Sequence, residues 1–169
     1  MDVLEAISTR RSIRRFTGQP VSDQDLDILL RAGFQAPSAH NRQPWHFVIV
    51  RDKETLGSIA GFHPYGKMLP KAGCGIVVCG DSLQQAETGF LVADCSAAIQ
   101  NILLAAHGIG LGAVWCGLYP IEDLTQSMSK LLGLPSNVIP VGVIAVGHRE
   151  EQKAPTDRYD RSKIHLERW

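Results

Sequence analysis

The residues best suited to chemistry in this chain lie in a short loop bounded by Pro37 and Pro44. Each proline fixes the backbone angle φ and removes a backbone donor, which restricts the shape of the loop. Between them, Ser38, Asn41 and Gln43 offer hydrogen-bond donors and acceptors. A pre-ordered polar loop favours a planar ligand rich in heteroatoms, because less entropy is lost on binding. An ordinary proline-bounded connection is the alternative.

A second candidate site is the arginine cluster near the start of the chain, where Arg10, Arg11, Arg14 and Arg15 surround Ser12. A guanidinium group presents a planar fork of donors that matches a phosphate group. The cluster therefore predicts a compact anion site. The alternative is a basic end to the preceding helix, where cations are favourable without any ligand.

Composition argues against several classes of protein. Lys+Arg and Asp+Glu are both 17 and the net charge is zero, whereas a nucleic-acid-binding domain is usually basic. The six histidines and four cysteines show none of the spacings typical of metal sites, so we expect no metal. No side chain has the local signature of a nucleophile, and we expect no catalytic residue from the protein. Such a chain suits an enzyme whose cofactor does the chemistry.

Length and polarity predict one globular domain without a membrane segment. The chain has 169 residues, of which 44% are hydrophobic and 20% charged. Met1 leads directly into an amphipathic pattern, and polar residues interrupt the most apolar segment, Phe90 to Ala106. We expect a cytoplasmic protein with reduced cysteines. Cys116 ends a strand beside a candidate ligand loop, but a packing role is favoured, because no neighbour in sequence would lower the pKa of its thiol.

Hydrophobic periodicity and capping signals predict alternating helices and strands around a central sheet. The expected elements are helix 2–10, a helix beginning at Ser22, strand 46–50, helix 53–60, strand 74–79, helix 83–107, strand 111–116, helix 121–132 and strand 138–146. Gly108 is expected at the end of the longest helix, and Pro140 near the start of the last strand. Residues 148–169 are mostly charged and cannot form a core alone.

The glycines Gly108, Gly110 and Gly112 have the spacing of a dinucleotide-binding fingerprint. We reject that interpretation, because the fingerprint follows a strand and opens a helix, whereas these glycines follow a helix and open a strand. The chain instead resembles the nitroreductase family of FMN-dependent oxidoreductases along its whole length. The motifs that carry this resemblance are the arginine cluster, the proline-bounded loop, the glycines Gly108, Gly110 and Gly112, and Val146-Gly147-His148.

The resemblance implies an α+β fold of three α/β/α layers, with a central, mostly antiparallel sheet flanked by helices. It implies a single FMN-binding domain over residues 1–169, whose C-terminal extension, residues 148–169, reaches onto the partner in a homodimer. FMN would lie at the subunit interface. Hydride would pass from NADH or NADPH through flavin N5 to nitroaromatics, quinones or activated alkenes in a ping-pong mechanism. Nucleic acid and membrane partners are not expected.

The resemblance also implies a set of cofactor-binding residues in this chain. The phosphate and ribityl groups would be bound by Arg10, Arg11, Ser12 and Arg14, with Gly147 and Arg149 at the phosphate end. The flavin ring would lie against Pro37, Ser38 and Ala39 of the second subunit, and its polar groups would be bound by Asn41 and Gln43. Exposed backbone N–H groups facing N5 would come from Gly117 and Leu118.

Residues 61–70 are the only candidate lid, because this compact chain lacks the extra helices of longer family members. Within the lid segment, Tyr65 and Lys67 are the candidate substrate contacts. Two other functions stay open. One is a different flavin enzyme on the same scaffold, such as a reductive dehalogenase or a flavin-fragmenting enzyme. The other is a non-catalytic flavin-binding or protein-interaction module.

Overall fold

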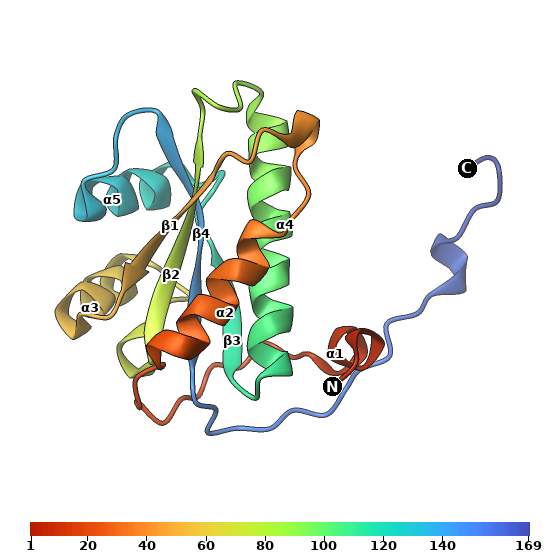
Figure 1. Cartoon of the computed structure of the whole chain (residues 1–169), viewed down its shortest axis with the longest axis horizontal. Helices are drawn as coiled ribbons and strands as arrows, with labels where there is room; N and C mark the ends of the chain where they lie inside the picture. Colours follow the sequence, from red (N-terminus) through yellow and green to blue (C-terminus); the bar gives the residue numbers. More distant parts are fainter.

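The structure, a computed structural model, describes all 169 residues and contains a four-stranded antiparallel sheet with helices on both faces (Figure 1). The helices are α1 (Val3–Thr9), α2 (Asp23–Phe34), α3 (Lys53–Phe62), α4 (Thr88–Gly108) and α5 (Glu122–Leu132). The strands are β1 (Trp45–Val50), β2 (Cys74–Asp81), β3 (Gly112–Gly117) and β4 (Val138–Gly147), in the order β1-β2-β4-β3. The expected α+β class with a central antiparallel sheet is confirmed.

Capping side chains begin the first two helices where the sequence predicts. The Asp2 carboxylate accepts a hydrogen bond from the Glu5 N–H at 2.9 Å, and Ser22 Oγ accepts one from the Asp25 N–H at 3.0 Å. Each side chain satisfies a donor that has no partner within its own helix. At the end of α5, Gly133 adopts the left-handed conformation with φ 63° and stops that helix.

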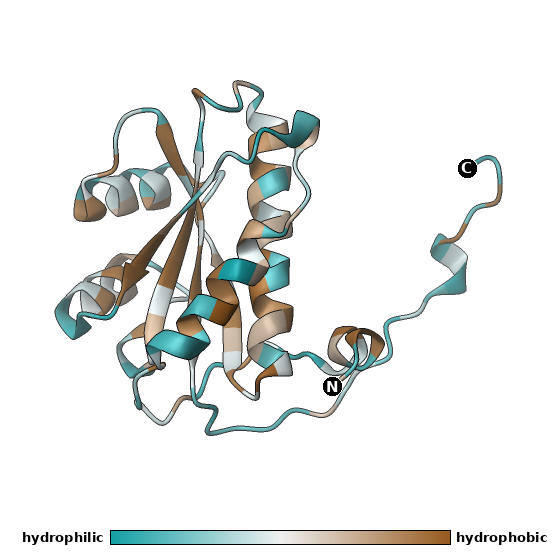
Figure 2. Cartoon of the chain, in the orientation of Figure 1, coloured by the Kyte–Doolittle hydropathy of each residue, from teal (hydrophilic) through white to brown (hydrophobic).

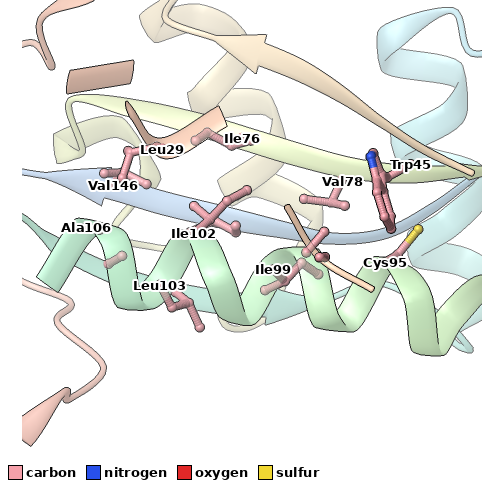
Figure 3. Packing of buried hydrophobic residues seen from close by; sticks show 14 of the residues in the cluster. Leu29, Trp45, Ile76, Val78, Cys95, Ile99, Ile102, Leu103, Ala106 and Val146 are labelled. Atoms are coloured by element: carbon pink, nitrogen blue, oxygen red, sulfur yellow. The ribbon is translucent and has the colours of Figure 1, made fainter. Parts of the chain in front are cut away.

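The central strand β2 contributes side chains to two separate cores, because successive residues of a strand point to opposite faces. Ile76 and Val78 lie on the face covered by α2 and α4, where Figure 3 shows them near Ile99 and Ile102 of α4. Burying a side chain of this size stabilises the fold by about 1.5–3 kcal/mol. Figure 2 shows the hydrophobic colouring concentrated on the strands between the helical layers.

The opposite face of the sheet is covered by α3 and α5. Val77 of β2 packs there in one core with Leu56 and Ile59 of α3 and Met128 of α5, all fully buried. This face matters for function, because the residues that follow α3 are the candidate lid segment. The position of α3 therefore determines which strand end the lid reaches.

The long helix α4 differs from its prediction at both ends. It begins at Thr88 rather than at Leu83, because the Asp81 carboxylate accepts the Leu83 N–H at 2.9 Å and forms a turn there. It continues through Gly108, and the left-handed residue that ends it is Gly110, with φ 87°.

By length and composition alone, α4 could cross a membrane, so the expectation that no segment is long enough is wrong on that measure. One such helix is weak evidence, since the core helix of a globular protein passes the same test. In this structure Leu91, Ala98 and Ala106 of α4 are fully buried within the chain, as expected for a core helix.

Pro140 lies near the start of β4, as the sequence predicts, and inside the paired part of the strand. The pairing of β2 with β4 shifts register between Val78 and Cys79, and Pro140 stands opposite Cys79 at this irregularity. A proline cannot donate to a strand ladder and is tolerated in a sheet at such a bulge. The bulge therefore explains how a strand with an internal proline remains continuous.

The N-terminal segment after α1 lies along the outer edge of β3. The Ile13 N–H donates to the Ala113 carbonyl at 3.0 Å, and Lys153 Nζ donates to the Ser12 carbonyl at 2.9 Å. The C-terminal segment thus packs beside the arginine cluster before it turns away from the rest of the chain (Figure 1). Trp169, at its end, is fully exposed.

Candidate functional site

The C-terminal end of β3 presents the backbone of Gly117 on the open edge of the sheet. The next residue, Leu118, is fully buried and its N–H donates to the Val141 carbonyl at 3.0 Å. The expectation that Leu118 exposes a backbone donor is therefore wrong, because antiparallel pairing continues one residue beyond the strand. Along an antiparallel strand, residues that hydrogen-bond to the neighbouring strand alternate with residues that do not. Because Leu118 bonds to β4, Gly117 turns its N–H and carbonyl away from β4.

The surroundings of Gly117 and Gly147, two of the expected cofactor-binding residues, differ. A Cβ atom on Gly117 would meet nothing within 4 Å, so nothing within the chain requires glycine there. A Cβ atom on Gly147 would lie 2.8 Å from the Gly73 nitrogen and 3.2 Å from the Phe16 ring. Gly147 is buried behind Phe16 and is needed for close packing, while its assignment to the phosphate end stays a prediction. Gly117 leaves open space against which a flat ligand could lie.

A pocket of about 460 Å³ between the N-terminal segment and the lid segment gathers positive charge. It is lined by Arg14, Arg15, Phe16, Lys67, Met68, Lys71 and Glu150. The structure thus brings together Arg14 and Lys67, which the sequence singled out from separate segments. Lys67 Nζ is held by the Ala60 carbonyl at 3.1 Å, at the end of α3. Four cations against one carboxylate favour an anionic or electron-rich ligand.

The other arginines line two further pockets next to α1. One, of about 450 Å³, includes Arg10, Arg11 and Arg158, and the other, of about 310 Å³, includes Arg11, His107 and Arg149. Burial and the nearby charges of Arg158 and Arg11 lower the pKa of the Arg10 guanidinium. Like charges gathered in this way attract an anion such as phosphate.

His107, near the end of α4, is a member of this cluster that the sequence did not reveal. The Thr9 hydroxyl donates to the Glu5 carbonyl at 2.6 Å and therefore accepts from His107 Nε2, 2.8 Å away. Burial, followed by the charges of Arg149 and Arg10, lowers the pKa of His107, against a smaller opposing effect of Glu5. A lone histidine at a helix end carries no sequence signal for such a role, because its neighbours come from distant segments.

We expect His107 to make the protein less stable in mild acid. Its pKa in the folded state lies below the ordinary value of 6.5, so the unfolded chain binds the proton more readily. Stability is therefore complete above about pH 6.5 and falls as the pH drops through the folded-state pKa. Urea unfolding of the wild type and His107→Gln at about pH 7.5 and about pH 5.5 tests this. An identical loss of stability in both proteins would contradict the prediction.

The proline-bounded loop is held in a fixed shape at the opposite end of α4. Ser38 Oγ accepts from the Gln43 N–H at 2.9 Å, and the Ala39 N–H donates to the buried Asp94 carboxylate at 2.9 Å. Gln43 Nε2 donates to Asn41 Oδ1 at 3.0 Å. These bonds are consistent with the expected stiffness of the loop, and Asn41 and Gln43 bond to each other within the chain.

Backbone strain in this loop also indicates a functional role. His40, Asn41 and Gln43 adopt positive φ values of 54°, 54° and 50°, which residues other than glycine seldom do. Such conformations persist only where the surrounding contacts impose them, and they concentrate at binding sites. Pro37 lies exposed beside these residues.

The two groups of candidate flavin contacts do not meet within one chain. The loop is bound to Asp94, and Thr9, which directly precedes the arginine cluster, is bound to His107; both partners lie on α4. At about 1.5 Å per helical residue, these two positions lie roughly 20 Å apart along the helix. Within one chain, the two groups therefore do not form a single site.

Cys116 has the packing role that its sequence context favours. The residue is buried beside the lid segment, its Sγ donates to the Tyr65 carbonyl at 3.3 Å, and burial raises the pKa of its thiol. Burial likewise raises the pKa of Cys74 to about 11, and those of Cys79 and Cys95 to about 12. None of the four is a reactive thiolate. Tyr65 itself is exposed.

An antiparallel sheet between helical layers, with cation-lined pockets at the edge strand, defines an α+β protein suited to an anionic cofactor. The model of the nitroreductase family matches residues 7–69 and 63–148 of the chain. The chain therefore belongs to the nitroreductase family, and by homology it is an NAD(P)H nitroreductase-like oxidoreductase.

Relatives with similar sequences span the whole chain. A protein of Methanothermobacter thermautotrophicus, provisionally named an NADH dehydrogenase/NAD(P)H nitroreductase, is 48% identical over 100% of this chain and 88% of its own length. A crystal structure from Parabacteroides distasonis with the same provisional name has 41% identity and a TM-score of 0.95, covering 98% of both chains. A nitroreductase structure from Desulfovibrio desulfuricans in complex with FMN has 33% identity and a TM-score of 0.84, covering 99% of this chain and 97% of that one.

Proposed function

We propose that this protein is an FMN-dependent oxidoreductase that passes hydride from NADH or NADPH to nitroaromatics, quinones or activated alkenes. The observation that carries the proposal is the cation-rich pocket that Arg14 and Lys67 line together, with the Gly117 backbone turned away from β4 at the end of the edge strand β3. When bound, FMN supplies a ring nitrogen that accepts hydride from the nicotinamide and donates it to the acceptor in a ping-pong cycle.

The residues present fit FMN. Gly117 has open space against its backbone, which suits a flat ring, and its N–H points away from the sheet. Arg14 and Lys67 would hold electron-rich ring atoms, and Arg10 with Arg149 would hold the phosphate group. These residues bind and orient, and none needs to act as an acid, base or nucleophile.

We further propose that two copies of the chain build each site. The separation of the arginine cluster from the proline-bounded loop along α4 supports this proposal, because a second copy would bring its own loop to the first copy's arginines. The exposed apolar residues Leu4 and Ile7 of α1, and Leu166 and Trp169 of the C-terminal segment, are also suited to burial against a partner. In this arrangement, Pro37, Ser38 and Ala39 reach the ring from the partner.

The first experiment is a visible absorbance spectrum of the purified protein after incubation with FMN and removal of the excess. Anaerobic addition of NADH, and separately NADPH, should bleach the flavin bands, and a nitroaromatic or quinone should then restore them. Bands that neither nucleotide bleaches would contradict the reductase function and favour a flavin-binding role. Failure to retain FMN would contradict the proposed site.

A further inference from the structure

His63, at the start of the lid segment (residues 61–70), lies outside every assignment made above. It is 1% exposed, and it is the only buried histidine of the chain. A buried imidazole must satisfy both of its ring nitrogens. Nδ1 faces the Tyr65 N–H at 3.1 Å, and Nε2 faces the Gly117 carbonyl at 2.9 Å. His63 therefore joins the lid segment to the open end of β3.

These two partners determine the protonation of the ring. The Tyr65 N–H can only donate, so Nδ1 must be the accepting nitrogen without a proton. The Gly117 carbonyl can only accept, so Nε2 carries the proton. The two partners therefore define one tautomer of His63, with Nδ1 accepting and Nε2 donating.

Two other contacts hold the lid segment in the same place. Cys116 Sγ donates to the Tyr65 carbonyl at 3.3 Å, so both backbone groups of Tyr65 are bound, one to His63 and one to β3. A Cβ atom on Gly66 would lie 3.0 Å from His63 Cβ, so the segment wraps closely around the histidine. Lys67 follows directly and faces the cationic pocket.

We propose that His63 is a positioning residue that holds Gly117 and Lys67 in the relative arrangement that flavin binding requires. The bond to the Gly117 carbonyl restrains the backbone of a glycine that no side-chain packing restrains. The bond to Tyr65 orders the lid segment that carries Lys67. The proposal rests on the proposed function, because it assigns Gly117 and Lys67 to the flavin.

Two conservative variants separate the two bonds. In His63→Asn, the shorter side chain keeps an oxygen where Nδ1 lies and can accept from the Tyr65 N–H, but it cannot reach Gly117. In His63→Gln, the longer amide can donate to the Gly117 carbonyl in place of Nε2. His63→Phe removes both bonds and keeps a ring of similar size. His46→Gln, an exposed histidine on β1, is the matched control.

FMN affinity and the rate of flavin bleaching by NADH are measured for all four variants. We expect His63→Asn and His63→Phe to bind FMN about tenfold more weakly and to bleach more slowly, because both lose the buried hydrogen bond to the Gly117 carbonyl. His63→Gln should restore most of the affinity, and His46→Gln should match the wild type. Unchanged FMN affinity and bleaching rate in His63→Asn and His63→Phe, with only lower thermal stability, would overturn the proposal.

A measurement without flavin keeps this proposal separate from the proposed function. Nitrogen NMR of the apoprotein should show His63 with a proton on Nε2 and none on Nδ1, and hydrogen exchange should show a protected Tyr65 amide that loses its protection in His63→Phe. A doubly protonated ring or an unprotected Tyr65 amide in the wild type would overturn the positioning role. A wild type with both expected signals that fails to retain FMN would instead contradict the proposed function.

Discussion

Replacing Arg10 or Arg14 with alanine is expected to weaken FMN binding by between about tenfold and a hundredfold. Each change removes a charge-assisted hydrogen bond of about 1.5–3 kcal/mol to an anionic or electron-rich part of the cofactor. Arg10 and Arg14 line cation-rich pockets, and neither guanidinium group forms a salt bridge with a carboxylate. Their charge is therefore available to a ligand. Fluorescence titration of FMN against each variant measures the effect.

The control for these variants is Arg31→Ala in α2. Arg31 is exposed and paired with Asp27 at 2.6 Å, so its loss should change FMN affinity little. Circular dichroism confirms that each variant folds before its affinity is compared. Wild-type affinity in both Arg10→Ala and Arg14→Ala would refute the assignment of the arginine cluster to the cofactor.

Mixing two inactive variants should restore FMN binding if each site is shared between two copies of the chain. One variant carries Arg10→Ala, and the other carries substitutions at Ser38 and Ala39 in the proline-bounded loop. In a mixed dimer, one site receives both defects and the other receives neither, so about half of the wild-type FMN content should return. At a flavin concentration near the wild-type Kd, either variant alone should hold little FMN, because both of its sites are weakened.

The mixed dimers are isolated by co-expression with two different affinity tags and two successive purifications, and FMN is counted by absorbance per dimer. The control is the same procedure with two copies of the Arg10→Ala variant, which should recover nothing. A wild-type protein that holds FMN as a monomer would contradict the shared site. Mixed dimers without FMN would contradict the assignment of the loop to the partner's flavin.

Signals confined to a few neighbouring residues were predicted well from the sequence. The starts of α1 and α2 were found because the capping bonds of Asp2 and Ser22 join residues three positions apart. The start of α4 was misplaced, because Asp81 uses its side chain to form a turn that interrupts the apolar pattern. The bulge at Pro140 was not predicted, since it depends on the pairing with β2, which lies far away in the sequence.

The candidate site was predicted by residue type, and only the tertiary structure grouped its members. Arg14 and Lys67 share one pocket because the N-terminal segment pairs with β3 while the lid segment binds its far end. Leu118 lost its expected role because of its bond to Val141, which follows from the register of β3 on β4. The assignment of the remaining candidate residues to FMN stays a prediction.

Residue order and type alone were enough to predict the α+β class, the family, the proline-bounded loop and the cationic character of the N-terminal segment. These properties depend on motifs, which involve neighbouring residues, and on composition and periodicity, which are summed along the chain. The tertiary structure alone decided that the loop and the arginines lie at opposite ends of α4, and that His63 and His107 join distant segments. Such relations depend on strand register and helix packing, in which each partner is positioned by residues far from it in the sequence.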